Sequence, residues 1–393
     1  MRILVSDYSG HPFQVQLSRE LSRRGHVVRH TFSTTFQTPK GNLSILPDDP
    51  AGFEIVAMRN KQAFSKGAFF RRRRQEIEIG ELLASQVAEF RPDTILSSNA
   101  PLDTQRIFQA AARKSGARFV FWLQDIYSHA IAQIVPAKFP IVGHGIAWWY
   151  RSMEFRMLKA SDHVIAITDD FKPILTAHGV DRHDITVIEN WAPLDALPQF
   201  PRDNILASRV MPGPGLRIVY SGTLGYKHNP ELLVKLAARL PEVQVHVFSE
   251  GKVADNLRVH AVNHSIANIH VHPWVAFDDL PKVLGGADIF IAVIECEAGK
   301  YSVPSKILTY LTIGRPILAS MPSNNLAAKL LLKYEAGIIA APGEDEDFLD
   351  AALALARDVG MRDRLASNAR AYAERTFAIE AIADRFLDVL SLP

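Results

Sequence analysis

Two short segments place a lysine beside the expected start of a helix. The first is Pro304-Ser305-Lys306, which follows an apolar, β-branched run at 287–294 and precedes a helical pattern that stops at Gly314. The first N–H groups of a helix lack intrahelical partners and carry the positive end of its dipole, so they stabilise a phosphate. Lys306 would add a full positive charge there. Alternatively, Pro304 only starts the helix and Lys306 is solvated.

A second segment with the same layout favours the binding interpretation. The run at 218–221 predicts a strand that enters a glycine turn at 222–225, and Asn229-Pro230 then opens a helix. Glycine lets a ligand approach the backbone, and Lys227 supplies a cation. Two such loops in one domain can hold a diphosphate between them.

Composition narrows the class of protein. A length of 393 residues suits two domains, and 48% hydrophobic with 22% charged residues indicates a globular chain. The net charge of +2 argues against a nucleic-acid binder. The single cysteine, Cys296, excludes an internal disulfide framework and fits a reducing compartment.

The sequence shows neither a targeting segment nor a membrane span. Residues 1–7 predict a first β-strand instead of a signal peptide, and no apolar stretch reaches the roughly 18 residues of a transmembrane helix. We therefore expect a cytoplasmic protein that is soluble or bound to the periphery of a membrane.

Strand-like and helical runs alternate along both halves of the chain. Strands are expected at 2–6, 26–31, 94–96, 118–123, 163–168 and 185–188, and again at 217–220, 243–248, 269–271, 289–294, 316–319 and 337–340. This alternation predicts an α/β protein with two doubly wound parallel sheets, whose ligands bind at the carboxyl ends of the strands.

Prolines and glycines crowd residues 199–215, which we expect to link the two domains. The N-terminal domain would then span 1–198 and the C-terminal domain 216–375. The last helix, at about 376–393, is expected to cross back onto the first domain.

Several motifs, in this order, resemble family 4 glycosyltransferases, which have two Rossmann-like domains facing across a cleft in the GT-B fold. The likeness covers essentially the whole chain and is nearest to bacterial surface-polysaccharide transferases of the colanic-acid and O-antigen kind. The motifs are Ser9-Gly10-His11-Pro12, residues 24–28, residues 122–127, Glu189-Asn190-Trp191, the Gly222 turn, Pro273-Trp274, and the segment from Pro304 to Pro316.

The resemblance implies a nucleoside diphosphate sugar donor, of UDP or GDP type, bound mainly by the second domain. Lys227 and Lys306 would lie near the diphosphate, and main-chain groups around Trp274 and Val275 would hold the base. The donor-binding residues implied are Gly222, Thr223, Leu224, Trp274, Val275, Tyr301, Ser302, Val303, Pro304, Ser305 and Thr309. The first domain would bind a polyprenyl-diphosphate-linked saccharide acceptor, with Ser9, Gly10 and His11 forming a loop over donor and acceptor.

The chain departs from the family pattern at three places. The two positions of the Glu-x7-Glu motif fall on Tyr301 and Thr309, the usual arginine of the glycine turn is Thr223, and the histidine of the first domain is Gln124. Asp125 stands next to Gln124.

The resemblance also implies transfer with retention of anomeric configuration, without a bound metal or another cofactor. Lys227 and Lys306 would stabilise the departing diphosphate. Asp125, the third residue with an implied catalytic role, would orient the acceptor hydroxyl or stabilise positive charge on the sugar ring. Alternatively, Asp125 is a helix cap after the strand that ends near Trp122.

A basic and aromatic stretch suits an anionic lipid surface. Its membrane-contacting residues would be Phe69, Phe70, Arg71, Arg72, Arg73 and Arg74. Alternatively, the arginines lie on a solvated helix with the phenylalanines in the core. Trp148-Trp149-Tyr150-Arg151 is a second candidate patch, although we favour core packing of at least one tryptophan. Four histidines at 260, 264, 270 and 272 lack cysteines at ligand spacing, so zinc is the minor interpretation.

The first hypothesis is therefore a glycosyltransferase of bacterial surface-polysaccharide synthesis, bound to the inner face of the plasma membrane. The first alternative is a nucleotide-sugar epimerase of the same fold, which would not need the basic patch. The second is a non-catalytic binding partner, suggested by the missing pair of glutamates. A nicotinamide dehydrogenase is disfavoured because Ser9-Gly10-His11 stands where a Gly-x-Gly-x-x-Gly turn would be needed.

Overall fold

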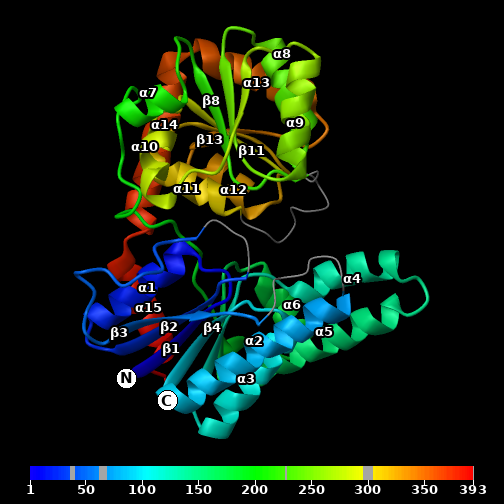
Figure 1. The fold of residues 1–393 in the computed structure, drawn as a ribbon, viewed down its shortest axis with the longest axis vertical. Helices are drawn as coiled ribbons and strands as arrows, with labels where there is room; N and C mark the ends of the chain where they lie inside the picture. The colour runs from blue at the N-terminus through cyan, green and yellow to red at the C-terminus, as the bar shows by residue number, and fades with distance from the viewer. Residues whose placement is uncertain (36–39, 62–68, 226–227, 295–303, 393) are drawn as a thin grey trace. The chain divides into compact units, whose positions relative to one another are not determined.

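A computed structural model describes residues 1–35, 40–61, 69–225, 228–294 and 304–392. The chain forms two compact units. The first unit contains Met1–Asn190 together with Ile379–Pro393, and the second contains Trp191–Ala378. Each unit holds one parallel β-sheet flanked by helices (Figure 1), which confirms the predicted α/β class.

The first unit is built on a seven-stranded sheet with the order β3-β2-β1-β4-β5-β6-β7. All neighbouring strands run parallel. The strands are β1 (Arg2–Asp7), β2 (Val27–Ser33), β3 (Phe53–Met58), β4 (Thr94–Ser98), β5 (Arg118–Leu123), β6 (His163–Ala166) and β7 (Ile185–Val187). Strand β3, at the sheet edge, is absent from the sequence prediction. Its burial is uneven along the strand, as expected for an edge position, so it lacks the continuous apolar run of the central strands.

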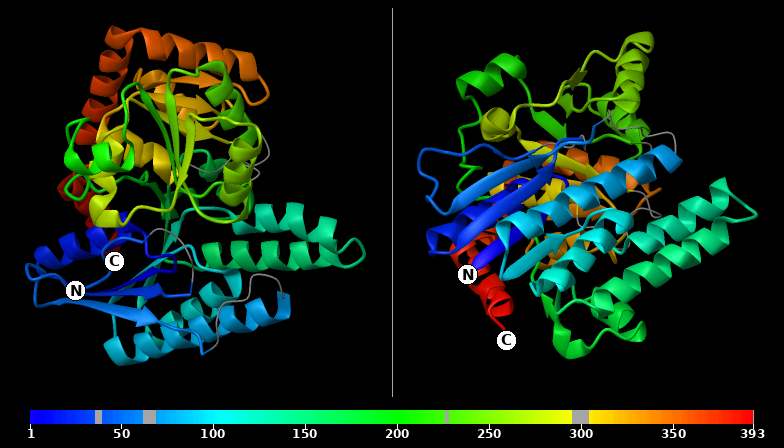
Figure 2. Two further views of the ribbon diagram at one scale, coloured as in Figure 1. Left: turned by 45° about the horizontal axis from the view of Figure 1, so that its top comes forward. Right: turned by 60° about the horizontal axis from the view of Figure 1, so that its bottom comes forward.

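In the first unit, helices α4 (Tyr127–Lys138) and α5 (Gly143–Lys159) form a pair that extends beyond the sheet (Figure 2). In chain order, the helices of this unit are α1 (Pro12–Arg23), α2 (Phe69–Phe90), α3 (Leu102–Ser115), α4, α5, α6 (Phe171–Ala177) and α15 (Ile379–Leu390). Helix α15 packs against α1, and its Phe386 ring lies edge-on to Trp122 of β5 at 4.8 Å. The C-terminal helix thus helps to close the core of the first unit.

The second unit is built on a six-stranded parallel sheet with the order β10-β9-β8-β11-β12-β13. Its strands match the predicted ones closely: β8 (Arg217–Ser221), β9 (Gln244–Phe248), β10 (Ile269–His272), β11 (Ile289–Val293), β12 (Ile317–Ser320) and β13 (Gly337–Ala340). Its helices are α7 (Ile205–Val210), α8 (Pro230–Arg239), α9 (Lys252–Asn263), α10 (Leu280–Gly285), α11 (Ser305–Ile313), α12 (Leu326–Lys333), α13 (Asp345–Arg357) and α14 (Val359–Thr376).

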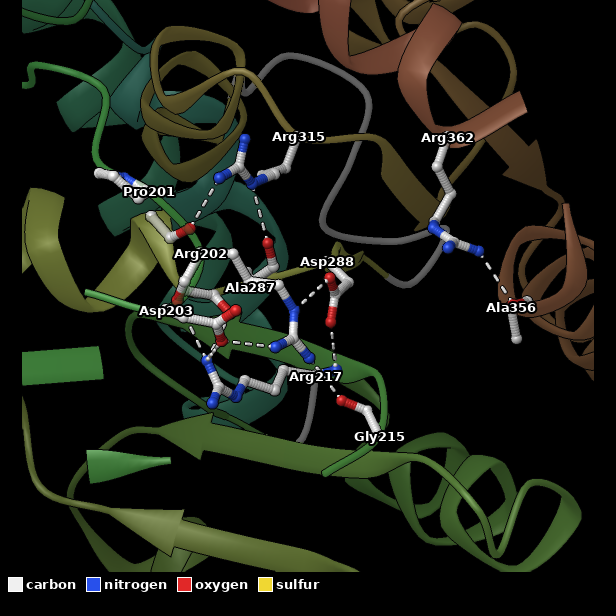
Figure 3. A network of polar contacts seen from close by, with 12 residues as sticks. Pro201, Arg202, Asp203, Gly215, Arg217, Ala287, Asp288, Arg315, Ala356 and Arg362 are labelled. Atoms are coloured by element: carbon white, nitrogen blue, oxygen red, sulfur yellow. Dashed lines mark hydrogen bonds and ion pairs between the residues drawn. The ribbon is translucent and has the colours of Figure 1, made fainter. Parts of the chain in front are cut away.

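Residues 199–215, which we expected to form a linker, belong to the second unit and include helix α7. Figure 3 shows how arginines fix this segment to the sheet. Arg202 Nε donates to Asp288 Oδ1 at 2.8 Å, and the backbone N–H of Arg217 donates to Asp288 Oδ2 at 2.8 Å. Arg315 donates to the carbonyl oxygens of Gly285 and Phe200 at 2.8 and 3.4 Å. Arg217 begins β8 and Asp288 precedes β11, so this network lies at the amino ends of the strands, away from the expected ligand edge.

Candidate active site

The glycine turn after β8 is held by hydrogen bonds on both sides. Gly222 N donates to Phe248 O at 3.0 Å, Leu224 N donates to Ser249 Oγ at 3.0 Å, and the Tyr220 hydroxyl donates to Thr223 O at 2.8 Å. Gly222 has a φ of +121°, which a side chain would strain. The turn therefore depends on glycine at its first position.

Lys306, the second residue of α11, lies against this turn. Its Nζ is 3.6 Å from the centroid of the Tyr220 ring, which is a cation–π contact. A Cβ added to Gly222 would lie 3.4 Å from Lys306 Cε, so the turn approaches the lysine closely. The two segments that the sequence analysis assigned to one diphosphate site are thus neighbours in space.

Tyr310, one turn further along α11, joins the helix to the end of β8. Its hydroxyl oxygen accepts from Ser221 N at 2.8 Å, and its ring stacks on Phe290 of β11 at 4.0 Å. Burial raises the pKa of the Tyr310 hydroxyl, so the group stays neutral at physiological pH. Tyr310 therefore fixes where the start of α11 and Lys306 lie relative to the sheet.

Trp274 and Val275, the predicted base-binding residues, line a cavity of about 200 Å³ at the carboxyl ends of β9 and β10. Trp274 N donates to Glu250 Oε1 at 3.1 Å. The Trp274 indole nitrogen is buried and has no hydrogen-bond partner within the described ranges. The remaining lining residues are Leu206, Val210, Phe248, His272, Pro273, Asp279 and Val283.

Other predicted donor residues divide between described and undescribed parts of the chain. Pro304 precedes α11 as its cap, Ser305 is the first residue of the helix, and Thr309 Oγ1 is 3.4 Å from the Ser305 carbonyl oxygen. Asn229 takes the left-handed conformation directly before α8 and makes no side-chain cap hydrogen bond. Lys227, Tyr301, Ser302 and Val303 lie outside the described residues.

In the first unit, the Ser9-Gly10-His11 loop is organised by a buried carboxylate at the end of β1. Asp7 Oδ1 accepts from Ser9 N at 3.1 Å and from Gly10 N at 2.9 Å. Burial raises the pKa of the Asp7 carboxyl to about 7, although these backbone N–H groups oppose the shift. Gly10, with a φ of +79°, accepts from Gly41 N at 3.1 Å. Burial lowers the pKa of the His11 imidazole to about 4, so His11 is neutral near pH 7.

Asp125 follows β5 and is exposed, and the structure argues against its role as a helix cap. The first N–H groups of α4, those of Tyr127 and Ser128, donate instead to the Glu154 carboxylate, both at 2.9 Å. Asn99 holds the loop in place, because its Nδ2 donates to Asp125 O at 2.6 Å and its Oδ1 accepts from Gln124 N at 2.8 Å. The backbone of Asp125 is therefore fixed at the carboxyl end of β5, and another carboxylate occupies the capping position.

The histidines of the second unit bond to one another and to neighbouring side chains. His246 Nδ1 lies 3.0 Å from His272 Nε2, and His270 Nε2 lies 2.7 Å from Gln244 Oε1. The described part of the chain contains no group of three or more His, Cys, Asp or Glu side chains arranged to hold a metal ion.

The predicted membrane residues lie at the start of α2, which begins with Phe69 and Phe70. Arg72 pairs with Glu76 at 2.8 Å and Arg73 with Asp103 at 3.0 Å, whereas Arg71 and Arg74 are exposed. The expectation that Trp148 or Trp149 packs in the core is wrong, because both are exposed. The buried aromatic residue is their neighbour Tyr150, whose hydroxyl donates to Asp103 at 3.0 Å. No described helix has the length and apolarity of a membrane span.

Sequence reasoning missed several residues that shape these loops. Ser249 and Glu250 directly follow β9, and Asn99 directly follows β4. Because ligands of doubly wound sheets bind at the carboxyl ends of strands, the position of these polar residues was a usable signal. Tyr310 and Glu154 lie within helices and act on residues distant in the sequence, so no local pattern marked them.

Comparison with known proteins gives matches along both units. Residues 11–191 match the family model of the "Glycosyl transferase 4-like domain", and residues 215–358 match that of "Glycosyl transferases group 1". A curated relative, "Putative colanic acid biosynthesis glycosyl transferase WcaI" of Escherichia coli K12, is 23% identical over 308 residues, which are 76% of this chain and 74% of that protein.

Solved structures show the same architecture. Alr3699/HepE from Anabaena, solved with UDP and glucose, has a TM-score of 0.71 at 16% identity over 100% of both chains. Sucrose-phosphate synthase from Thermosynechococcus elongatus has a TM-score of 0.74 at 14% identity over 99% of this chain and 98% of its own. The chain therefore belongs to the glycosyltransferases of the GT-B fold, and joins a glycosyltransferase 4-like domain to a group 1 domain.

Proposed function

We propose that this glycosyltransferase moves a sugar from a nucleoside diphosphate donor to a polyprenyl-diphosphate-linked saccharide during synthesis of a bacterial surface polysaccharide. The colanic acid name of the relative supports the pathway class, and the UDP bound in the Anabaena structure supports the donor class. The observation that carries the proposal is the contact between Lys306 and the Gly222 turn at the end of β8.

Lys306 is suited to the leaving group of the reaction. As the bond between the sugar and the diphosphate breaks, negative charge accumulates on the diphosphate. A lysine ammonium at the start of a helix offers both a full charge and the positive end of the helix dipole. In this proposal the diphosphate lies between the Gly222 turn and the start of α11, and it needs no metal ion for charge compensation.

Asp125 is proposed to act on the acceptor side. Its carboxylate is exposed, its backbone is fixed by Asn99, and Glu154 has taken over the capping of α4. In the proposed mechanism Asp125 orients the acceptor hydroxyl or stabilises positive charge on the sugar ring, and transfer proceeds with retention. The acceptor is lipid-linked, so we place the enzyme at the cytoplasmic face of the membrane.

The first experiment is thermal unfolding in the presence of UDP, GDP, ADP or TDP and their common sugar conjugates, with and without magnesium. Selective stabilisation by one nucleotide, unchanged by magnesium, would support the proposal and name the donor base. Absence of stabilisation by every nucleotide would count against it.

Product analysis separates the proposal from its alternatives. The purified enzyme, its donor and a short-chain polyprenyl-diphosphate saccharide should give an elongated lipid whose new linkage keeps the donor's anomeric configuration by NMR. Conversion of the donor sugar without an acceptor would indicate an epimerase. Tight donor binding without any product would indicate a binding partner.

A further inference from the structure

Helices α4 and α5 form an antiparallel hairpin that extends beyond the sheet of the first unit (Figures 1 and 2). The hairpin is pinned at its base, where Glu154 of α5 accepts the first N–H groups of α4. At the far end Gly143 N donates to Phe139 O at 2.7 Å, and a Cβ on Gly143 would lie 2.6 Å from Pro136 Cα. Both ends are therefore well defined, and the turn presents residues 139–142 outward.

The far end of the hairpin exposes large aliphatic side chains. Ile141 is 96% exposed, Ile134 64% and Val142 56%, and we call these three residues the apolar tip. Scattered single aliphatic residues on a surface are ordinary, but three at the end of one projecting element form a patch. Such a patch indicates an interaction surface.

Aromatic and basic residues follow the apolar tip in sequence along α5. At the helical rise of about 1.5 Å per residue, Trp148 lies roughly 7 Å from the start of α5 and Arg151 roughly 12 Å. Arg156 and Lys159 lie still further from the tip. Along α5 this order, aliphatic, then tryptophan, then cation, matches the layers of a bilayer surface from hydrocarbon to headgroup. Lys138 ends α4 beside the tip, and its long side chain can extend its charge toward the headgroups.

The basic start of α2 joins the same surface. The guanidinium carbon of Arg73 lies 5.4 Å from the centroid of the Trp149 ring, so the α2 arginines and the α5 tryptophans meet. The two patches that the sequence suggested separately are therefore continuous. Arg71 and Arg74, in the same turn of α2, are exposed.

The positive charge of the hairpin favours an anionic partner. No Asp or Glu occurs between Asp125 and Glu154, whereas Lys138 and Arg151 lie within this stretch. A carboxylate-free, basic and apolar surface complements anionic lipid. A second copy of the chain would bring the same positive charges against it, which is unfavourable.

We propose that the α4–α5 hairpin docks the enzyme on an anionic bilayer, with the apolar tip inserted among the acyl chains and Trp148 and Trp149 at the headgroup level. Insertion of this kind reaches about 5–10 Å into the membrane and does not cross the bilayer. The inference extends the proposed function and rests on it in one respect, because the lipid-linked acceptor is what brings the enzyme to a membrane. The hairpin would hold the enzyme beside a lipid-linked acceptor.

The test measures binding of the full chain to sedimented vesicles of phosphatidylcholine, with and without phosphatidylglycerol. Binding should require phosphatidylglycerol and weaken with salt. The double variant Ile141→Ser, Val142→Ser should lower partitioning at least about tenfold, because both side chains leave water on insertion. Ile205→Ser is the matched control, since Ile205 is 90% exposed on α7 of the second unit, and it should bind normally.

A second measurement reports how deeply the hairpin inserts into the bilayer. Brominated acyl chains should quench part of the tryptophan emission of the bound enzyme, and Trp148→Phe should reduce that quenching. Normal vesicle binding by the double tip variant would overturn the inference, as would failure of the wild-type chain to bind anionic vesicles. Self-association that the tip substitutions abolish, without vesicle binding, would assign the surface to a second copy and would also overturn it.

Vesicle binding needs neither donor nor acceptor, so the two proposals fail separately. If the enzyme binds vesicles normally but transfers no sugar, the result would count against the proposed function alone. Conversely, the tip variant should keep its transfer rate to a short-chain, water-soluble acceptor.

Discussion

The two units share one strand order around their first strand but differ in the charge at the carboxyl ends of their strands. In each sheet the first strand of the unit, β1 or β8, lies between the second and the fourth strand of that unit. In a doubly wound sheet this reversal of strand order is where ligands bind. The two units therefore offer the same position in the fold for different chemistry.

Near this edge the first unit carries two carboxyl groups together with Lys40, whose Nζ donates to Ser33 O at 2.9 Å, and the second unit carries Lys306. Asp7 ends β1 and Asp125 follows β5, whereas Lys306 approaches the turn after β8. Glu250, the carboxylate that follows β9, accepts the backbone N–H of Trp274. Topology thus fixes where a ligand can bind, and the loop residues decide its charge. The proposed function accordingly assigns the anionic diphosphate to the second unit and the acceptor hydroxyl to the first.

The largest expected effect comes from removal of the cation of the second unit. Lys306→Met keeps most of the apolar stem over Tyr220 but removes the charge, and it should lower kcat/KM by about 100-fold or more. Nucleotide-induced thermal stabilisation should fall with it. Steady-state kinetics and thermal unfolding measure both effects.

A matched control tests whether the loss is specific to this lysine. Lys333 also lies over a tyrosine ring, with its Nζ 5.1 Å from the centroid of Tyr334, but at the end of α12. Lys333→Met should leave kcat/KM unchanged. Equal losses in both variants would mean that a general change in the second unit, and not charge beside the Gly222 turn, explains the result.

A smaller effect is expected from the first unit. Asp125→Asn should lower kcat about tenfold to 100-fold, because it weakens the hold on the acceptor hydroxyl or the stabilisation of positive charge, while nucleotide-induced stabilisation stays at the wild-type level. This pattern would separate an acceptor-side unit from a donor-side unit. If Asp125→Asn abolished nucleotide stabilisation, the division of roles between the units would be wrong.

The sequence was sufficient for most of the second sheet and for the segments of the diphosphate site. Each strand there is a short apolar run next to Gly, Pro or Asp residues. Both the run and its ends can therefore be recognised in the sequence. Pro304, Lys306 and Gly222 were found because helix starts and glycine turns have local signatures. Their contact in the structure follows from placing both at the carboxyl edge of one sheet.

What the sequence missed depends on contacts between distant residues. Glu154 takes the capping role that Asp125 could have had, and nothing near Asp125 indicates this. Ser221, at the end of strand β8, is fixed by Tyr310, which lies in helix α11. Exposure of Trp148 and Trp149 follows from the projection of the α4–α5 hairpin, whereas hydropathy alone favours burial of tryptophan.

The third prediction concerns the pH dependence of the first unit. Burial raises the pKa of Asp7 from 3.8 to about 7, so the folded state holds a proton that the unfolded state releases between these values. Stability of the first unit should therefore decrease as the pH rises from about 4 to about 7. Asp7→Asn keeps an oxygen acceptor for Ser9 N and Gly10 N but cannot ionise, so it should lack this decrease.

Hydrogen exchange of peptides from β1, followed from about pH 4 to pH 8, measures this effect locally. Asp93→Asn is a suitable control, because Asp93 accepts from Arg2 N at 2.7 Å at the opposite end of β1. A pH dependence that persists in Asp7→Asn would show that another group is responsible.

The smallest expected effect is a loss of stability of the second unit as the pH falls, which is opposite in sign to the effect of Asp7. Burial is the main cause that lowers the pKa of His246 to about 3 and that of His272 to about 4, both below the ordinary value of 6.5. Protons then bind the unfolded state first, so the second unit should lose stability as the pH falls below about 6.5. His246→Phe retains a ring between His270 and His272 but cannot titrate, and it should weaken the acid sensitivity of β9 in hydrogen exchange. His264→Phe, at an exposed position of the same unit, should not. Opposite pH dependences in β1 and β9 would show that both sheets favour the neutral form of their buried groups and differ in the type of group they bury, a carboxyl in β1 and imidazoles in β9 and β10; parallel ones would contradict that interpretation.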